Sequence, residues 1–198
     1  MLNNMANEIE RKSIINDILI PSLERLYKKD YFNIRIGVSE RNICARLAYH
    51  METIMHESDN FRDFFADVEY NRKNDGSIKH SEGYKKVSLL MVSDLIVHKR
   101  NADNNLLAVE MKRWNNPKKR EHDRFRLKSV VSSPEEGKDD CVYDTSLGAF
   151  IIYSAEKVLV EFYGKVNGKG DWIGEMEFQC KLEGNRCLSL EIIRESWI

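Results

Sequence analysis

The residues with the clearest chemical potential lie between Asp94 and Lys112, where the chain reads SDLIVHKRNADNNLLAVEMK from residue 93. Two apolar runs, LIV and LLAV, flank a polar segment rich in Asn and Asp, which predicts two strands joined by a turn. Side chains alternate between the faces of a strand, so Glu110 and Lys112 share one face while Met111 points to the other. In an antiparallel pair the first strand begins where the second ends. We therefore expect Asp94 to converge with Glu110 and Lys112.

Two carboxylates and an ammonium group at one edge of a sheet suit metal-assisted chemistry on phosphate esters. Mg²⁺ is held by few carboxylates and keeps much of its hydration shell. Such an ion polarises a phosphoryl group and lowers the pKa of a bound water. A lysine can orient that water and offset the charge that develops on the phosphate. The pattern predicts a Mg²⁺ site, with Mn²⁺ as an alternative ion, in which Asp94 and Glu110 are the metal ligands and Lys112 assists the reaction.

The Glu-x-Lys element carries little information by itself, because the chain contains it three times. Glu10 to Lys12 lies in a helical pattern, and Glu136 to Lys138 lies in a polar segment that contains glycine. Only the element that ends at Lys112 closes a strand and follows a strand that begins with Asp. The specificity of the motif therefore comes from its context.

The Asp, the spacer and the Glu-x-Lys on the following strand resemble the signature of the PD-(D/E)XK nuclease superfamily. Ser93 stands where the family often has Pro, a position that varies. The resemblance covers about residues 39–154 and implies the restriction-endonuclease-like fold, an α/β domain with a mixed central sheet flanked by helices. It also implies metal-dependent hydrolysis of nucleic-acid phosphodiester bonds, with DNA as the expected substrate. The alternative is a catalytically inactive module on this fold that binds nucleic acid or protein.

A helix is predicted over residues 39–56, where Ser39 is a good N-cap and Glu40 follows it. The segment SERNICARLAYHM resembles the helix that precedes the sheet in a bacterial subgroup of the superfamily. In the superfamily a Glu from that helix often joins the metal site, so the resemblance implies that Glu40 is an additional ligand or contacts one. A purely structural explanation stays open, since an acid in the first turn complements the helix dipole.

The strongest charge asymmetry follows the motif. Eight Lys or Arg and two acids lie between residues 112 and 128, and Asn116 followed by Pro117 predicts a helix start. We expect this basic helix to contact nucleic-acid phosphates, which would position the substrate without reading its sequence. A solvated helix face is the alternative. The residues predicted to bind nucleic acid are Lys118, Lys119, Arg120, Arg124 and Lys128.

Composition limits the remaining possibilities. The formal net charge of −1 argues against nucleic-acid binding by the protein as a whole, so any contact must come from a local patch. The four cysteines have no zinc spacing, and we expect reduced thiols. No segment is apolar enough to span a bilayer and no signal-peptide core is visible, which favours a cytoplasmic location.

The 198 residues are expected to form a single domain. It divides into N-terminal helices (1–36), a nuclease-like core (37–154) and C-terminal strands that extend the sheet (155–198). The N-terminal helix is predicted over residues 5–29 with a break at Pro21. Strands are predicted at 67–72 and 87–97 before the Glu-x-Lys strand, and four more follow residue 146. The N-terminal helices could also dock a partner protein or a second copy.

Overall fold

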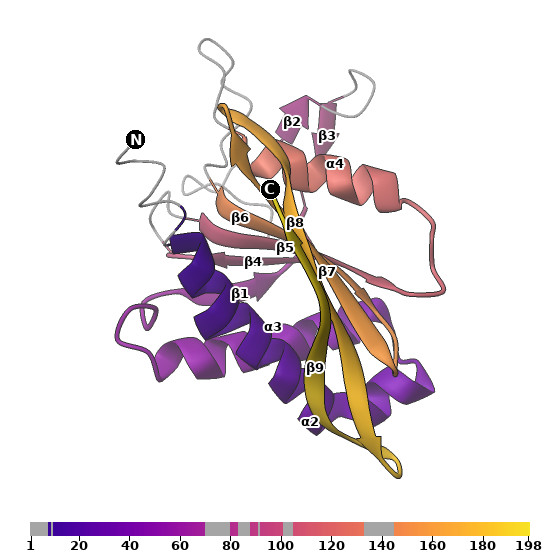
Figure 1. The fold of residues 1–198 in the computed structure, drawn as a ribbon. Helices are drawn as coiled ribbons and strands as arrows, with labels where there is room; N and C mark the ends of the chain where they lie inside the picture. The colour runs from indigo at the N-terminus through magenta and orange to yellow at the C-terminus, as the bar shows by residue number, and fades with distance from the viewer. Residues whose placement is uncertain are drawn as a thin grey trace.

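The structure, a computed structural model, describes residues 8, 10–69, 80–82, 88–90, 92–100, 105–132 and 145–198. Within these ranges a π-helical segment, η1 (Ile14–Leu19), is followed by two helices, five strands, a third helix and four more strands (Figure 1). The helices are α2 (Ile20–Ile36), α3 (Glu40–His56) and α4 (Arg120–Val130). The strands are β1 (Phe65–Val68), β2 (His80–Glu82), β3 (Ser88–Leu90), β4 (Leu95–His98), β5 (Asn105–Arg113), β6 (Thr145–Tyr153), β7 (Lys157–Val166), β8 (Lys169–Glu183) and β9 (Arg186–Trp197).

Seven strands form one mixed sheet in the order β1-β4-β5-β6-β7-β8-β9. β1, β4 and β5 pair antiparallel, and β6 lies parallel to β5 after the crossover through α4. β7, β8 and β9 then continue the sheet as antiparallel strands. The core thus has three antiparallel strands, a helix and a parallel strand, and the predicted C-terminal extension of the sheet is confirmed.

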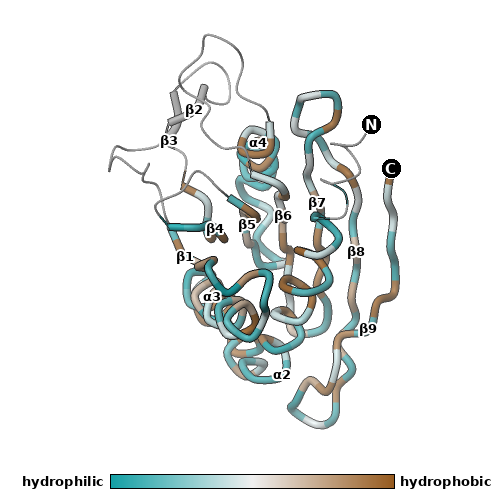
Figure 2. The backbone as a smooth tube through the Cα atoms, turned by 90° about the vertical axis from the view of Figure 1, so that its left-hand side faces the viewer, coloured by the Kyte–Doolittle hydropathy of each residue, from teal (hydrophilic) through white to brown (hydrophobic). Residues whose placement is uncertain are grey.

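Helices cover both faces of the sheet. The larger apolar core joins η1, α2 and α3 to one face, where Val97, Val109 and Met111 are buried. The smaller core joins α4 to the opposite face, where Leu127 packs with Ile96 and Ala108. Figure 2 shows α2 and α3 on one side of the strands and α4 on the other. The mixed α/β architecture is as predicted. Successive side chains of β4 and β5 point to opposite faces of the sheet and so into the two different cores.

The N-terminal helices differ in detail from the prediction. The chain stays helical through Pro21 because this residue lies in the first turn of α2, directly after the π-helical segment, where no amide donor is needed. The irregularity lies instead at Asp30, whose backbone angles are not helical. α2 leaves Phe32 and Ile36 exposed one turn apart, with Arg35 over the Phe32 ring. A docking role for these helices stays a prediction.

Two predicted strands are also corrected. The single strand expected over residues 87–97 is divided: β3 pairs with β2 in a separate two-stranded sheet, and β4 begins only at Leu95. The first strand begins earlier than expected, at Phe65, and residues 70–72 of the prediction lie outside the described residues. The turn predicted between β4 and β5 includes residues 101–104, which also lie outside them.

The prediction of reduced thiols is wrong for one pair of cysteines. A disulfide joins Cys180 of β8 to Cys187 of β9 across the hairpin that these strands form. Cys44 is free and buried on α3. As for membranes, none of the helices in the described ranges combines the length and the apolar character needed to cross one.

Candidate active site

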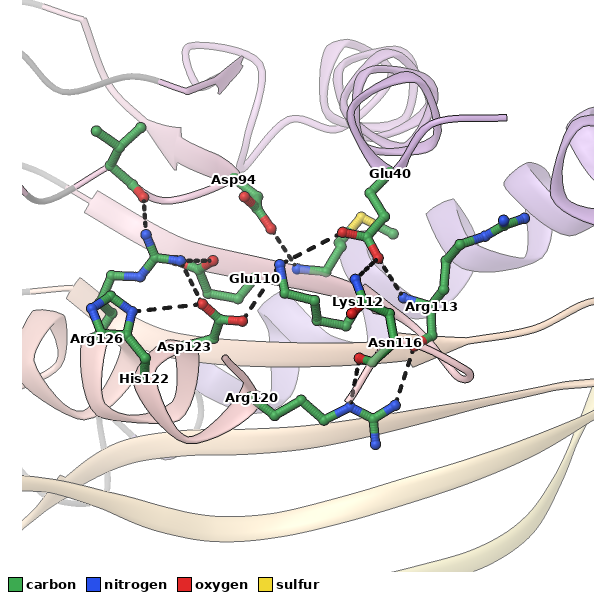
Figure 3. Close-up of polar contacts among 12 residues, drawn as sticks. Glu40, Asp94, Glu110, Lys112, Arg113, Asn116, Arg120, His122, Asp123 and Arg126 are labelled. Carbon is green, nitrogen blue, oxygen red and sulfur yellow. Dashed lines mark hydrogen bonds and ion pairs between the residues drawn. The ribbon is translucent and has the colours of Figure 1, made fainter. Parts of the chain in front are cut away.

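The register of β4 and β5 brings Asp94 to Glu110. The strands pair Leu95 with Val109 and Ile96 with Ala108, so Asp94 and Glu110 stand at the next position of the ladder. The carboxylate of Asp94 accepts a hydrogen bond from the backbone N–H of Met111 at 2.8 Å (Figure 3). This bond ties Asp94 to the end of β5, beside the face that Ala108 and Glu110 present to α4.

Glu110 is completely buried, which is unusual for a carboxylate. Its Oε2 accepts a hydrogen bond from Nη2 of Arg126 at 2.7 Å. Its Oε1 has no hydrogen-bond partner among the described residues. Burial raises the pKa of Glu110 well above its ordinary value and the negative charge of Asp94 raises it further, against the opposing effect of Arg126.

Lys112 extends between two carboxylates that come from opposite sides of the sheet. Its Nζ lies 3.6 Å from Oε2 of Glu40 and 3.5 Å from Oδ2 of Asp123. Burial acts to lower the pKa of Lys112, but the surrounding carboxylates, led by Asp123 and Asp94, outweigh it and raise the pKa. Lys112 is therefore a fixed positive charge at neutral pH and is unsuited to act as a general base.

Glu40 reaches the site from the first turn of α3, whose N-cap is Ser39 as predicted. Its Oε1 accepts hydrogen bonds from the backbone N–H of Arg113 and from Nδ2 of Asn116, both at 3.0 Å. Burial acts to raise the pKa of Glu40, yet these two hydrogen bonds and Lys112 lower it below its ordinary value. Glu40 therefore stays ionised, and its contacts join α3 to the end of β5 and to the turn that follows.

Asp123, like Arg126, is a residue of this cluster that the sequence analysis did not identify. It lies in the first turn of α4 and is only 1% exposed. Its Oδ1 accepts a hydrogen bond from Arg126 at 2.7 Å, whereas its Oδ2 has no hydrogen-bond partner among the described residues. The available signal was its spacing, because an acid three residues before an arginine on a helix lies on the same face as that arginine.

Arg126 links the acids of the sheet to α4. Nη2 of its guanidinium group donates to both Glu110 and Asp123, and Nη1 donates to the backbone carbonyl of Val92 at 2.9 Å. Four carboxylates, those of Glu40, Asp94, Glu110 and Asp123, thus surround two cations, Lys112 and Arg126. When all of these groups are ionised, the cluster has an excess of two negative charges.

The carboxylate oxygens and the net charge of the cluster decide whether it fits a divalent metal ion. Glu110 Oε1 and Asp123 Oδ2 are buried carboxylate oxygens without hydrogen bonds to the part of the chain that the structure describes, and the excess of two negative charges with all groups ionised equals the charge of one Mg²⁺. Mg²⁺ needs only one or two carboxylates and keeps several waters. Within the described residues, however, no group of three or more His, Cys, Asp or Glu is arranged as a metal site. The donor set thus fits a hydrated Mg²⁺ better than an ion enclosed by protein ligands.

The basic helix is shorter than predicted and begins at Arg120. The side chain of Asn116 donates to Glu40 and does not cap the helix, and Lys119 adopts a left-handed conformation (φ 64°) just before α4. Arg120 donates to the backbone carbonyls of Arg113, Trp114 and Asn116, so it fixes the turn after β5.

Two more of the predicted nucleic-acid contacts have structural partners. Arg124 forms a double hydrogen bond with Glu161 of β7 at 2.6 and 2.8 Å. Lys128 pairs with Asp171 at 2.6 Å. Lys118 and Lys119 are exposed and form no ion pair with the described residues. Of the five residues, these two lysines are the most available for a ligand.

A hollow of about 450 Å³ lies at the start of α4. Its lining is Pro117, Lys119, Arg120, Glu121, His122 and Arg124, and it includes none of the four residues predicted to carry the reaction. The hollow lies at the N-terminal end of α4, beside the acidic cluster's helix rather than over its acids. Basic side chains dominate this hollow, which is the property that phosphate binding needs.

Comparison with family models, curated proteins and solved structures finds no match to this chain. The resemblance to the nuclease superfamily therefore rests on the motif and on the geometry described above.

Proposed function

We propose that this protein is a metal-dependent nuclease that hydrolyses phosphodiester bonds of nucleic acid, with DNA as the expected substrate. The observation that carries the proposal is the cluster around Lys112. The Asp that precedes β4, the Glu-x-Lys of β5 and the Glu of α3 belong to one cluster, in which two buried carboxylate oxygens lack hydrogen bonds to the described residues. Burying charge without full compensation is costly, and active sites are where proteins tolerate that cost.

Each residue has a role that follows from its contacts. Asp94 and Glu110 would hold Mg²⁺ or Mn²⁺, with Asp123 as a further carboxylate within the cluster. A bound metal supplies charge neutralisation at the phosphate and a more acidic water. Lys112 is held between Glu40 and Asp123, so its ammonium group is fixed in position before substrate binds. A preoriented cation stabilises the charge that develops in the transition state.

The competing function is a binding module that retains these charges without turnover. The specific observation in its favour is Arg126, whose guanidinium group already pairs with both Glu110 and Asp123. In a purely structural cluster this arginine would be the permanent counter-ion of the two acids. In a nuclease a metal ion has to bind beside it or displace it.

The deciding experiment is a cleavage assay of the purified protein on single- and double-stranded DNA and on RNA, with Mg²⁺, with Mn²⁺ and with chelator. We expect metal-dependent cleavage that is lost in Asp94→Asn, and calorimetric binding of Mg²⁺ that is lost in the same variant. A protein that cleaves none of these substrates and binds neither ion would favour the binding module. Cleavage that survives Asp94→Asn unchanged would assign the activity to another site.

A further inference from the structure

The seven-stranded sheet ends in two very different edges. β1, at one edge, has only four residues, whereas β9, at the other, has twelve. Among the described residues β9 pairs only with β8, and its second half forms the outermost strand in Figure 2. Proteins usually protect a long edge with charged side chains, especially lysine, with proline or a β-bulge, or by keeping the strand short. β9 contains neither lysine nor proline.

The second half of β9 also exposes large apolar side chains. Ile192, Ile193 and Trp197 are 52%, 55% and 42% exposed, and the following Ile198 is 78% exposed. The first half is partly covered: Cys187 and Leu190 are buried and Arg35 of α2 donates a hydrogen bond to Asn185 at the hairpin turn, whereas Leu188 is exposed. Every residue from 191 to 198 is exposed, so the least covered part of the edge is this second half of β9.

The order of charges along β9 indicates what can pair with it. Across β8, Arg194 stands opposite Glu177 and Ile192 opposite Phe178, so Ile193 is a bulged residue without a partner. With the bulge excluded, Glu191 and Arg194 are the two neighbours of Ile192 on the strand. A second β9 that ran antiparallel with Ile192 opposite Ile192 would place each Glu191 opposite an Arg194 of the other copy.

Registers of the same pairing that place a charged residue on the axis are worse. A two-fold axis requires one residue to face its own copy, because the two strands are identical and antiparallel. An axis at Glu191, Arg194 or Glu195 would place two like charges directly opposite each other, which destabilises a sheet. The axis at Ile192 instead brings isoleucines together and forms two pairs of opposite charge.

We propose that β9 is a dimerisation edge at which two copies of this chain pair antiparallel about Ile192. The two sheets then form one continuous sheet, and the uncovered isoleucines become buried. The proposal is independent of the nuclease activity, because Ile192 and its neighbours belong to the sheet edge farthest from β4 in the strand order.

The test uses two charge reversals on the full chain. Glu191→Arg creates two Arg–Arg contacts in its own dimer, and Arg194→Glu creates two Glu–Glu contacts. Each variant should weaken self-association roughly tenfold, from the usual size of cross-strand charge effects summed over two pairs. An equimolar mixture of the two variants restores both opposite-charge pairs, so it should form heterodimers. Glu183→Arg, beyond the paired segment at the hairpin turn, is the control and should dimerise like the wild type.

Sedimentation over a concentration series, with one variant tagged, measures these associations, and circular dichroism checks that each variant is folded. A wild-type protein that stays monomeric over the series would overturn the proposal. So would a mixture of the two variants that associates no more strongly than either variant alone. Restored association in the mixture would support both the edge and the register.

Discussion

The carboxylate of Asp94 accepts its hydrogen bond from Met111, the residue between Glu110 and Lys112. Met111 points its side chain into the core that α3 covers, while its amide faces the neighbouring strand. The bond therefore fixes the acid that directly precedes β4 to the middle residue of the Glu-x-Lys element. Because the backbone of β5 holds it, the position of Asp94 does not depend on a metal ion.

Asp94→Asn should leave the fold intact and remove metal binding. The amide oxygen of Asn can still accept the Met111 hydrogen bond, so we expect a change in unfolding free energy within about 0.5 kcal/mol, as for most substitutions that break no buried contact. The loss of one negative charge should abolish Mg²⁺ binding and cleavage together. Titration calorimetry and the cleavage assay check this. The control Asp63→Asn removes an exposed acid that pairs with Lys99 and should bind Mg²⁺ like the wild type.

Lys112→Ala should separate metal binding from turnover. The substitution removes the cation between Glu40 and Asp123 but none of the proposed ligands. We expect Mg²⁺ to bind still, with the cleavage rate reduced roughly 10²–10³-fold, the typical effect of losing a group that stabilises transition-state charge. Cleavage rates of the variant and the wild type at saturating Mg²⁺, together with Mg²⁺ titration of both, check this prediction. A variant that loses metal binding and cleavage to the same extent would assign Lys112 a structural role in the site.

Glu110 should make stability depend on pH in a defined direction. Its pKa is raised in the folded protein, mainly by burial, so the folded state holds the proton more tightly than the unfolded state. Stability should therefore fall as pH rises from about 4.5 through the raised pKa, by at most about 1.4 kcal/mol per pH unit. Glu110→Gln cannot titrate. Urea unfolding without divalent ions should show that the unfolding free energy of the variant increases relative to that of the wild type as pH rises. If the two unfolding free energies changed with pH in the same way, the prediction would be wrong.

The hairpin could be predicted from the sequence because its signal is local. Two short apolar runs around a polar turn indicate β4 and β5, the two-residue period of a strand sets which side chains share a face, and antiparallel pairing then sets the position of Asp94. The start of α4 could not be predicted in this way. Asn is a residue type that often caps a helix, but the side chain of Asn116 donates its hydrogen bond to Glu40, a residue 76 positions away. A tertiary contact of this kind leaves no trace in the local pattern.

Asp123 and Arg126 were missed as site residues for a related reason. In the sequence they belong to a basic run, and such a run is typical of a solvated helix or a phosphate-binding surface. Only the packing of α4 on the sheet turns one face of the helix inward and brings Asp123 and Arg126 against Glu110. The same packing gives Arg124 and Lys128 acidic partners on β7 and β8.

Lys118 and Lys119 should account for most of the phosphate contacts near α4. The double variant Lys118→Gln, Lys119→Asn removes both charges, and Asn tolerates the left-handed conformation of residue 119. DNA binding should weaken, and the slope of log K against log salt should decrease by roughly one to two, because fewer counterions are released. Lys128→Gln is the matched control, since Lys128 pairs with Asp171. An unchanged slope in the double variant would mean that these lysines form a solvated surface.

Arg126→Met and Arg124→Met form a matched pair that tests whether the acidic cluster binds a metal ion. Both substitutions remove an arginine of α4 from a nearly buried carboxylate: Arg126 pairs with Glu110, and Arg124 pairs with Glu161. Removing one partner of a buried pair typically costs about 3–5 kcal/mol, so both variants should unfold at lower urea concentration than the wild type.

Mg²⁺ should distinguish these two variants. In Arg126→Met the excess negative charge of the cluster increases, so Mg²⁺ should bind more tightly than in the wild type and restore more stability. A hundredfold excess over the dissociation constant contributes about 2.7 kcal/mol. In Arg124→Met the ion has no new site, so its effect should equal that on the wild type. Urea unfolding with Mg²⁺ and with chelator measures both. Equal Mg²⁺ effects on the two variants would mean that Arg126 is a permanent counter-ion, and the binding module would then be the better account of this fold.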